Sequence, residues 1–395
     1  MRINNRGIIE SESLMIVGNG FDLNLGAKTS YKHFYECLKK CYNSADLSEF
    51  STYYQNSKNA NSVKTFYECV KNETDNYFVN YFLNYETIFG SWVSFENELS
   101  KIVSSFDMMV SFLDSTSDSF IEQGGNFASL YVCTSNYPKL LSVLNTYPNN
   151  KFFKSLTELQ WVRKEGQAVE LIIGGDKRIK DLYQLRNCVE KFAESFPFEL
   201  YEDLTAFSNL FSLYLSIVRN SANLKKKMST FSICRLFLNY NYTKYLEQFL
   251  KRNHYEFDKL LYINGEVERN RKKDSGIVFG IDSNVNLSNA SFSIFTKNMQ
   301  RSIKETNINK FEKLANEKIT NIYIFGHSLS LSDYESLNYL LSNVEKNWKP
   351  TIHIYYFDDI SRGSLIINLK TILGEELFNN YQRQNRIVLL PFNQA

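Results

Sequence analysis

The sequence lacks several features that would assign it to a simple class of protein. No uninterrupted apolar run approaches the ~18 residues that a membrane-spanning helix needs. The first residues, MRINNRGIIESES, lack the apolar core region of a signal peptide. The net charge is only +2, so the chain offers no broad basic surface for nucleic acid. We therefore expect a cytoplasmic protein that contacts neither membrane nor nucleic acid.

Cysteine is also sparse and without a metal-binding pattern. Cys37 and Cys41 lie four residues apart and can share a helix face, but no second pair completes a zinc site among the six cysteines. We expect reduced thiols that act as small apolar side chains, and no bound metal. The chain contains no internal repeat and no low-complexity tract.

The chain is nevertheless long and apolar enough for a large core. Its 395 residues exceed one average domain, so two structural units are expected. Hydrophobic residues make up 43%, and the 26 Tyr and 31 Phe suit thick packing of helices.

The most informative stretch is Leu14 to Lys32, LMIVGNGFDLNLGAKTSYK. A short apolar strand, a Gly18-Asn19-Gly20 turn and a helix start form the arrangement that presents backbone N–H groups to a nucleotide phosphate. Gly18 and Gly20 can adopt positive φ and permit close approach of a ligand. The full G-x-G-x-x-G fingerprint is not met, because Gly26 lies six residues after Gly20. A tight turn without a ligand remains the alternative.

Strand and helix patterns alternate in the rest of the chain except between residues 51 and 230. Strands are expected at 14–17, 232–238, 259–263, 276–281, 321–325, 351–357 and 387–390. Helices are expected at 31–50, 242–250, 303–314, 332–344 and 365–373. Such alternation favours an α/β fold with a mostly parallel, Rossmann-like sheet. We expect residues 1–50 plus 231–395 to form this nucleotide-binding domain and residues 51–230 to be an all-helical insertion, with loops at 51–63 and 116–126.

Small, polar and ionisable residues follow several of these strands. Because ligands bind beyond the carboxyl ends of parallel strands, these residues should converge. They are Gly18, Asn19, Gly20 and Asp22; Asn239, Asn241, Tyr242 and Thr243; Asn264, Gly265 and Glu266; Gly280 and Asp282; Gly326, His327, Ser328 and Asp333. Each also has a structural interpretation, since Asn241 can cap a helix and Asp333 suits a first helical turn.

Six blocks of the sequence resemble one family. In order, GNGFDLNLGAKTSY, WVSFENEL, FLNYNYTKYLEQF, LYINGEV, FTKNMQ and FGHSLSLSDYESL are similar to the bacteriophage abortive-infection AbiH family, from Leu14 to about Leu341. The resemblance implies a bacterial anti-phage defence role in which infected cells stop growing or die before phage is released.

A more remote similarity extends to sirtuin-like NAD-binding domains, several of which hydrolyse NAD in defence proteins. Gly18-Asn19-Gly20, Asn241, Asn264-Gly265 and Gly326-His327-Ser328 resemble their motifs. This resemblance implies an NAD glycohydrolase that needs no further cofactor. Two departures are visible: Asn264 stands where the family commonly has a histidine general base, and Lys28 replaces a proline. Asparagine cannot act as a base near neutral pH, so His327 would have to substitute.

The resemblance assigns roles to named residues. Gly18, Gly20 and Ser328 would hold a diphosphate, Asn241 would orient the ribose or a water, and Asp22 or Asp333 would stabilise oxocarbenium charge or accept a proton. Glu96 would approach from the insertion and make the site depend on domain closure. The expected catalytic set is Asn241, Asp22, His327, Asp333 and Glu96. The expected ligand-binding set is Gly18, Asn19, Gly20, Thr29, Thr243, Asn264, Gly265, Gly326 and Ser328.

Two other functions stay open at this point. The fold could be a catalytically inactive sensor of a nucleotide or phage component, which the loss of a histidine at Asn264 would suit. Alternatively, Asp22, Asp282 and Asp333 could bind a divalent metal for phosphoester hydrolysis, with a small basic loop at Arg269, Arg271, Lys272 and Lys273. A phage-derived trigger and homo-oligomerisation are expected to gate a toxic activity.

Overall fold

The structure is a computed structural model that describes most of the chain. Backbone and side chains are described for residues 12–54, 60–83, 95–104, 106–107, 110–111, 194–219, 221–267, 276–282, 285–304, 306 and 309–394. The backbone alone is described for residues 84, 130–133, 162–165, 168–171, 182–193 and 308. Trp92, the loop expected at 116–126 and the basic residues 269–273 lie outside these ranges.

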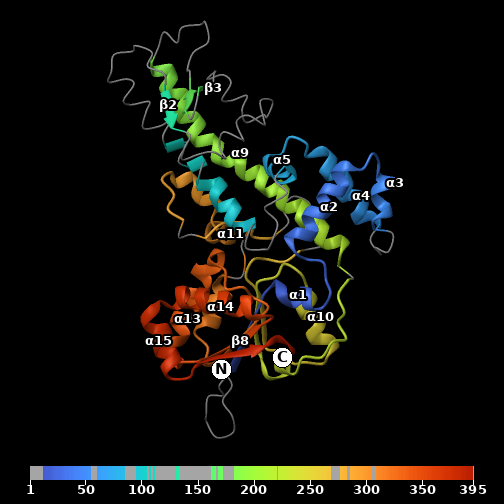
Figure 1. Cartoon of the computed structure of the whole chain (residues 1–395), viewed down its shortest axis with the longest axis vertical. Helices are drawn as coiled ribbons and strands as arrows, with labels where there is room; N and C mark the ends of the chain where they lie inside the picture. The colour runs from blue at the N-terminus through green and yellow to red at the C-terminus, as the bar shows by residue number, and fades with distance from the viewer. Residues whose placement is uncertain are drawn as a thin grey trace.

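A six-stranded parallel sheet occupies one end of the molecule (Figure 1). Its strand order is β6-β5-β1-β7-β8-β9. The strands are β1 (Glu12–Val17), β5 (Leu236–Asn239), β6 (Lys259–Tyr262), β7 (Ile319–Phe325), β8 (Thr351–Tyr356) and β9 (Ile387–Pro391). The chain leaves β1 toward one edge and later returns to build toward the other, so the strand order reverses between β1 and β7. In open α/β sheets, the crevice beyond the carboxyl ends at such a reversal is where ligands bind.

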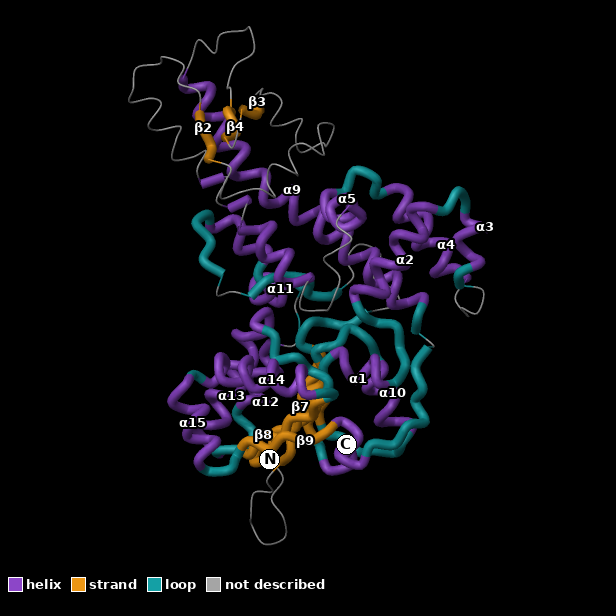
Figure 2. The backbone as a smooth tube through the Cα atoms, viewed as in Figure 1, coloured by secondary structure: helices purple, strands orange, loops and turns teal. Residues whose placement is uncertain are grey.

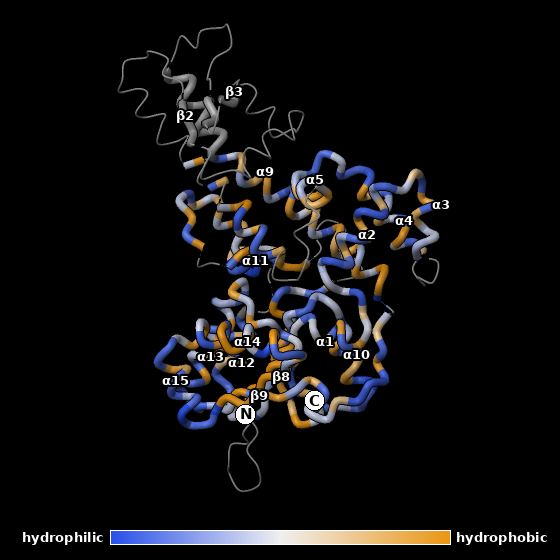
Figure 3. The backbone as a smooth tube through the Cα atoms, viewed as in Figure 1, coloured by the Kyte–Doolittle hydropathy of each residue, from blue (hydrophilic) through white to orange (hydrophobic). Residues whose placement is uncertain are grey.

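Both faces of this sheet are covered by helices, as expected for parallel strands. Leu14 and Ile16 of β1 pack on one side and Met15 and Val17 on the other, in keeping with the two-residue period of a strand. The first side carries α12 (Ile308–Ala315), α13 (Tyr334–Trp348), α14 (Asp359–Leu373) and α15 (Glu375–Arg383); the second carries α1 (Asn19–Asn24) and α10 (Tyr245–Arg252). In Figure 3 the strands β8 and β9 are coloured apolar, whereas the outer helix α15 is largely hydrophilic.

A second, aromatic-rich core lies among the helices that come between β1 and β5 in the sequence (Figure 2). Its rings stack from several helices; Phe95 and Phe207, for instance, have centroids 5.9 Å apart and near-parallel planes. These helices are α2 (Tyr31–Asn43), α3 (Leu47–Thr52), α4 (Ala60–Asn72), α5 (Tyr77–Asn84), residues 95–104 and α9 (Leu182–Ile217). Many of the Phe and Tyr side chains therefore pack in this core. The division of the chain into two domains stays a prediction.

The expectation that residues 51–230 are all helical is wrong. A three-stranded antiparallel sheet in the order β2-β4-β3 lies within this part of the chain. Its strands are β2 (Leu130–Cys133), β3 (Val162–Glu165) and β4 (Ala168–Leu171). Four-residue strands span too few alternations to give a period-two signal in a sequence dominated by helical spacing.

The strand expected at 276–281 is also wrong, because this segment makes only a single bridge from Ile281 to Thr296. Its apolar side chains, Ile277, Phe279 and Ile281, belong to the aromatic core rather than the sheet. The backbone of Phe279 bonds instead to the amide of Gln300, which accepts at 2.8 Å and donates at 2.9 Å. The alternating apolar pattern therefore predicted an extended backbone, but it did not predict which groups form hydrogen bonds with that backbone.

The remaining elements agree with expectation except at certain boundaries. The segment expected as a strand at 232–238 begins in a 3₁₀ turn (Ser229–Ile233) and pairs only from Leu236. The helix expected at 303–314 begins later, as α12, and is preceded by α11 (Lys297–Ile303), which was not predicted. The helix expected at 31–50 is divided into α2 and α3. The polar loop expected at 51–63 is shorter, because α3 ends at Thr52 and α4 begins at Ala60. Helix α15 carries no prediction from the sequence.

Candidate functional site

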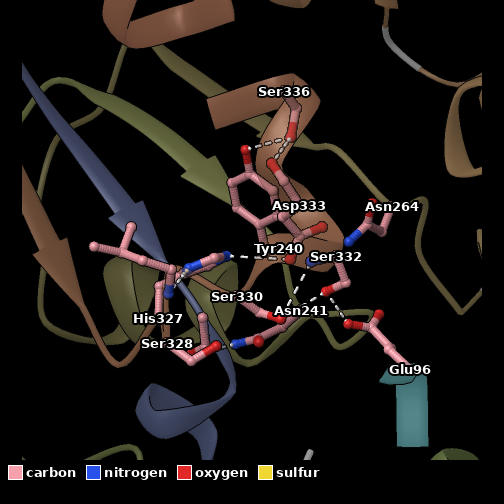
Figure 4. A network of polar contacts seen from close by, with 12 residues as sticks. Glu96, Tyr240, Asn241, Asn264, His327, Ser328, Ser330, Ser332, Asp333 and Ser336 are labelled. Carbon is pink, nitrogen blue, oxygen red and sulfur yellow. Dashed lines mark hydrogen bonds and ion pairs between the residues drawn. The ribbon is translucent and has the colours of Figure 1, made fainter. Parts of the chain in front are cut away.

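Several of the residues expected to converge meet around the carboxyl ends of β1, β5 and β7, which are adjacent strands. They form two connected groups. One surrounds the carboxylate of Asp22, and the other surrounds the ammonium of Lys297, whose two carboxylate partners, Glu96 and Asp333, are labelled in Figure 4.

Asp22 is buried, with only 1% of its surface exposed. Its Oδ1 accepts a hydrogen bond of 3.0 Å from Asn241 Nδ2, and its Oδ2 accepts one of 2.6 Å from Thr243 Oγ1. Burial raises the pKa of Asp22 to about 7, although the hydrogen bonds from Thr243, Asn241 and Thr29 oppose this shift. A carboxyl group with this pKa can take up or release a proton near neutral pH.

Asn241 links this carboxyl group to the first turn. Its Nδ2 also donates to the backbone oxygen of Gly18 at 3.1 Å, so both amide protons are used. Among the described residues no donor contacts its Oδ1. This oxygen can therefore accept a hydrogen bond from a ligand hydroxyl group or from a water. The alternative role of Asn241 as a helix cap is not seen, because its side chain makes no bond to α10.

The three glycines of the site have a packing role that the sequence did not indicate. Gly18 has an extended φ of −119° and Gly20 lies inside α1, so neither uses positive φ. A Cβ on Gly18 would lie 2.5 Å from the Cα of His327, and one on Gly20 would lie 2.7 Å from the Cα of Gly326. Gly326 itself has φ +65°. The turns after β1 and β7 therefore touch backbone to backbone; we call this contact the glycine crossing.

The N–H groups of the glycine crossing are already bonded within the protein. Gly18 N donates to Phe325 O at 3.1 Å and Gly20 N donates to Gly326 O at 2.8 Å. The expectation that these two N–H groups hold a diphosphate is therefore not met in this structure, since a ligand would have to displace strand-like bonds. Thr29 is buried as well and donates to Asn19 Oδ1 at 2.8 Å, which ties the loop before α2 to the start of α1.

Lys297 is the centre of the second group. Its Nζ lies 2.7 Å from Glu96 Oε1 and 2.8 Å from Asp333 Oδ1, and all three side chains are almost completely buried. Ser332 donates to the other oxygen of Glu96 and also contacts Ser330 Oγ at 3.0 Å. In Figure 4, Glu96 reaches toward Ser332 from the helical part of the molecule. The site therefore combines side chains from the aromatic-core helices and from the sheet.

The two carboxyl groups that share this ammonium have opposite pKa shifts. Burial raises the pKa of Glu96, and the nearby Asp333 adds to this against the opposing attraction of Lys297. Burial acts on Asp333 too, but Lys297 and His327 together bring the pKa of Asp333 well below its usual range. Burial lowers the pKa of Lys297, which the two carboxylates outweigh, so its net shift is upward. We infer an ionised Lys297–Asp333 pair beside a Glu96 that takes up a proton more readily.

His327 is held in one orientation by its surroundings. Its Nδ1 accepts a hydrogen bond of 2.9 Å from Leu329 N, which places the proton of the neutral ring on Nε2. That Nε2 lies 3.5 Å from Asp333 Oδ2. The ring of Tyr240 packs edge-on against it at 4.5 Å, and the Tyr240 hydroxyl contacts Ser336 Oγ at 3.0 Å. His327 therefore faces the Lys297 group. A histidine that substitutes for the one replaced by Asn264 would need this orientation.

Asn264, which replaces that histidine, has a structural partner. Its Oδ1 accepts a hydrogen bond of 2.9 Å from Arg301 Nη2, and both side chains are buried. The adjacent Gly265 has φ +76°, and a Cβ there would collide with the backbone oxygen of Gly276. This turn is fixed by packing.

Ser328 lies apart from both groups, because it is exposed and its backbone oxygen accepts a bond from Asn368 Nδ2 at 3.0 Å. Glu266 lies apart as well and pairs with Lys244 at 3.3 Å. Asp282, considered for a metal, accepts instead from the backbone N of Glu335 at 3.2 Å. Within the part of the chain that the structure describes, no group of three His, Cys, Asp or Glu side chains is placed to hold a metal ion.

Sequence reasoning missed the polar face of α11. Lys297, Gln300, Arg301 and Lys304 recur with helical spacing and are all buried. The block FTKNMQ contains the N-cap Thr296 and the buried Lys297, so the signal was present. Lysine and arginine are normally exposed, and only a paired partner such as Glu96 shows that they are buried.

A pocket of about 210 Å³ lies beside the Asp22 group. Thr243, which bonds to Asp22, forms part of its wall together with Lys244, Arg219 and Tyr245. No described helix is long and apolar enough to cross a membrane.

No curated protein and no solved structure matches this chain. The family model described as bacteriophage abortive infection AbiH matches residues 14–356, which include both groups of the site. The chain therefore belongs to the AbiH family of bacteriophage abortive-infection proteins.

Proposed function

We propose that this protein is an abortive-infection effector that binds a nucleotide at the carboxyl edge of a Rossmann-like sheet and hydrolyses its N-glycosidic bond. NAD is the first substrate to test. Membership of the AbiH family implies a role in bacteriophage abortive infection. The strand order supports the proposal, because it reverses between β1 and β7 next to the buried acidic groups. A sirtuin-like origin of this sheet, a phage trigger and an oligomeric state stay predictions.

One observation carries the chemical part of the proposal. Glu96 and Asp333 share the ammonium of Lys297 but have pKa shifts of opposite direction. Paired ionisable groups whose surroundings separate their pKa values are typical of acid–base and glycosidic chemistry.

The proposed reaction breaks the bond between ribose C1′ and the nicotinamide nitrogen. The bonding electrons leave with nicotinamide, which becomes neutral, and the ribose becomes an oxocarbenium ion. The ionised Asp333 stabilises this positive charge, and a water oriented by Asn241 Oδ1 adds to C1′. The proton of that water passes to Asp22 or Glu96, whose raised pKa values suit this task.

The test is the NAD concentration over time with purified protein, beside Asn241→Ala and Asp22→Ala. We expect NAD loss with the wild type and a decrease of at least 100-fold in either variant, in the range that a positioned acid–base group contributes. Asn343→Ala is the matched control, because that asparagine is partly exposed on α13 and its side chain donates to Tyr339 O, away from both groups of the site. If folded protein leaves NAD intact both alone and in phage-infected lysate, NAD hydrolysis is excluded.

A nucleotide sensor without catalysis is the second candidate. It is favoured by Asn264, whose oxygen is held by Arg301 where a basic histidine would otherwise stand. Saturable NAD binding without turnover in infected lysate would support this candidate. Activity that EDTA abolishes and Mg²⁺ restores would instead support the metal-dependent phosphoesterase predicted as a further alternative.

A further inference from the structure

A second pocket lies on the other side of Asp333, between α11, α12 and α13. It has a volume of about 200 Å³, and its wall includes Arg301, Phe311, Glu335, Ser336 and Tyr339. Ser336 connects it to the charged cluster, since its Oγ donates to the backbone oxygen of Asp333 at 3.1 Å and contacts the Tyr240 hydroxyl. This volume holds one ring system and is smaller than the 300–1,000 Å³ or so of sites for whole drug-sized ligands.

Arg301 contributes a buried guanidinium group to this pocket wall. The side chain is 6% exposed, and its Nη2 is bonded to Asn264. Its Nε has no acceptor within the described residues but is closed off from the pocket. A ligand acceptor in the pocket would therefore meet Arg301 through the part of the side chain that lines the wall.

The aromatic part of the wall favours a flat ligand. The rings of Phe311 and Tyr339 lie with centroids 5.8 Å apart and planes tilted by 41°. Phe311 is buried, whereas Tyr339 is 39% exposed and stands at the opening. Aromatic faces of this kind bind planar heterocycles by stacking.

The charges of the pocket exclude a simple anion. Glu312 and Glu335 line it together with Arg301, so a free phosphate or carboxylate would meet like charge. Carboxylates accept hydrogen bonds from ring N–H and amino groups, while the guanidinium of Arg301 donates to a carbonyl oxygen or a ring nitrogen. A ligand with a donor and an acceptor on one planar ring satisfies both.

We propose that this pocket binds a nucleobase-like heterocycle. The inference rests on the proposed function in one respect, because it assigns the base of the proposed nucleotide to this pocket. It does not depend on hydrolysis, because a sensor would need the same pocket.

The experiment measures binding of adenosine, guanosine, cytidine, uridine and nicotinamide riboside by saturation-transfer NMR and calorimetry, with ribose and inorganic phosphate as comparison ligands. We expect at least one nucleoside to bind saturably while ribose and phosphate do not. Tyr339→Ala should raise its Kd by about fivefold or more, the lower end of base stacking. Arg301→Lys keeps the positive charge but removes the planar guanidinium, and should also weaken binding.

Tyr53→Ala is the matched control, because Tyr53 is a half-exposed tyrosine at the end of α3. Absence of nucleoside binding by the folded protein, or binding that Tyr339→Ala and Arg301→Lys leave unchanged, would overturn the proposal. Nucleoside binding that Tyr339→Ala weakens, without NAD loss either alone or in phage-infected lysate, would support the pocket and reject hydrolysis. NAD loss that Tyr339→Ala does not slow, with no change in KM, would reject the pocket and leave hydrolysis standing.

Discussion

Lys297 balances the charge of the site at the scale of single residues. It is 2% exposed and has two buried carboxyl groups within 2.8 Å. Burying an ion is costly unless a partner of opposite charge compensates, and removing one partner leaves the other charge unpaired. The stability of the protein and the chemistry of the site therefore depend on the same ammonium.

Lys297→Met is expected to reduce the free energy of unfolding by about 3–5 kcal/mol at pH 8. Without the ammonium, the folded-state pKa values of Glu96 and Asp333 rise above those of the unfolded chain. The penalty therefore grows as the pH increases from about 4 and is smaller below it. Urea unfolding at pH 4 and pH 8 measures this difference. Lys251→Met removes an exposed i, i+4 pair on α10 and should change stability by less than about 0.5 kcal/mol.

Asp22 gives a second pH dependence with a defined window. Its folded-state pKa of about 7 lies above the ordinary aspartate value of 3.8. Between these values the unfolded chain has lost its proton while the folded protein keeps it, so stability falls as the pH rises and levels off above 7. The total loss is up to about 4 kcal/mol.

Asp22→Asn should remove this part of the pH dependence, because the amide is neutral and its two polar atoms can still contact Asn241 and Thr243. We expect the variant to be more stable than the wild type at pH 8 and equal to it at pH 4. It should also lack NAD hydrolysis. A variant with the wild-type pH profile would show that Asp22 is ionised throughout this range.

The glycine crossing decides how two elements meet. Alanine normally stabilises a helix position relative to glycine by about 0.5–1 kcal/mol. Gly20→Ala should do the opposite and destabilise by about 1–3 kcal/mol, since its Cβ would lie 2.7 Å from backbone in the turn after β7. Gly363→Ala on α14 is the control, because nothing lies within 4 Å of the added Cβ. Thermal unfolding should show opposite signs for the two substitutions.

Helices and strands with regular apolar patterns could be predicted from the sequence. The residues with which they form hydrogen bonds and ion pairs often could not. The parallel sheet and its helices followed from apolar runs that alternate with helical spacing. The strand expected at 276–281 failed because its backbone bonds to loops and side chains rather than to a neighbouring strand; Gln300, for instance, bonds to both backbone groups of Phe279. At the site, Asp22 and Asn241 were expected to meet because both follow strands. Lys297 and Arg301 were missed because their burial depends on Glu96 and Asn264, which no local pattern places nearby.

Buried polar links join the aromatic-core helices to the rest of the molecule. Besides Glu96, the Asp107 carboxylate accepts two 2.7 Å hydrogen bonds from the backbone N–H groups of Ser288 and Asn289. The Tyr214 hydroxyl donates to Lys28 O at 2.6 Å. The Asp107 bonds hold the segment before α11 in place, and therefore the start of α11 at Lys297.

Asp107→Ala should leave two backbone donors without their acceptor and destabilise this segment by about 2–4 kcal/mol. Hydrogen exchange measured by mass spectrometry should accelerate across residues 285–304 and remain unchanged in β8 and β9. Asp46→Ala provides the comparison, since that exposed aspartate caps only α3. Faster exchange confined to the residues around 107 would show that the link does not transmit to α11.

The charged cluster also has a consequence for synthesis of the protein on the ribosome. Its members are drawn from positions 96, 297 and 333, so the ammonium and both carboxylates come together only after most of the chain has been translated. A nascent or truncated polypeptide that ends before α13 lacks Asp333 and therefore cannot form the complete charged cluster around Lys297. Because the proposed activity harms the host cell, this order of assembly would keep incomplete chains inactive and delay toxicity until translation is nearly finished.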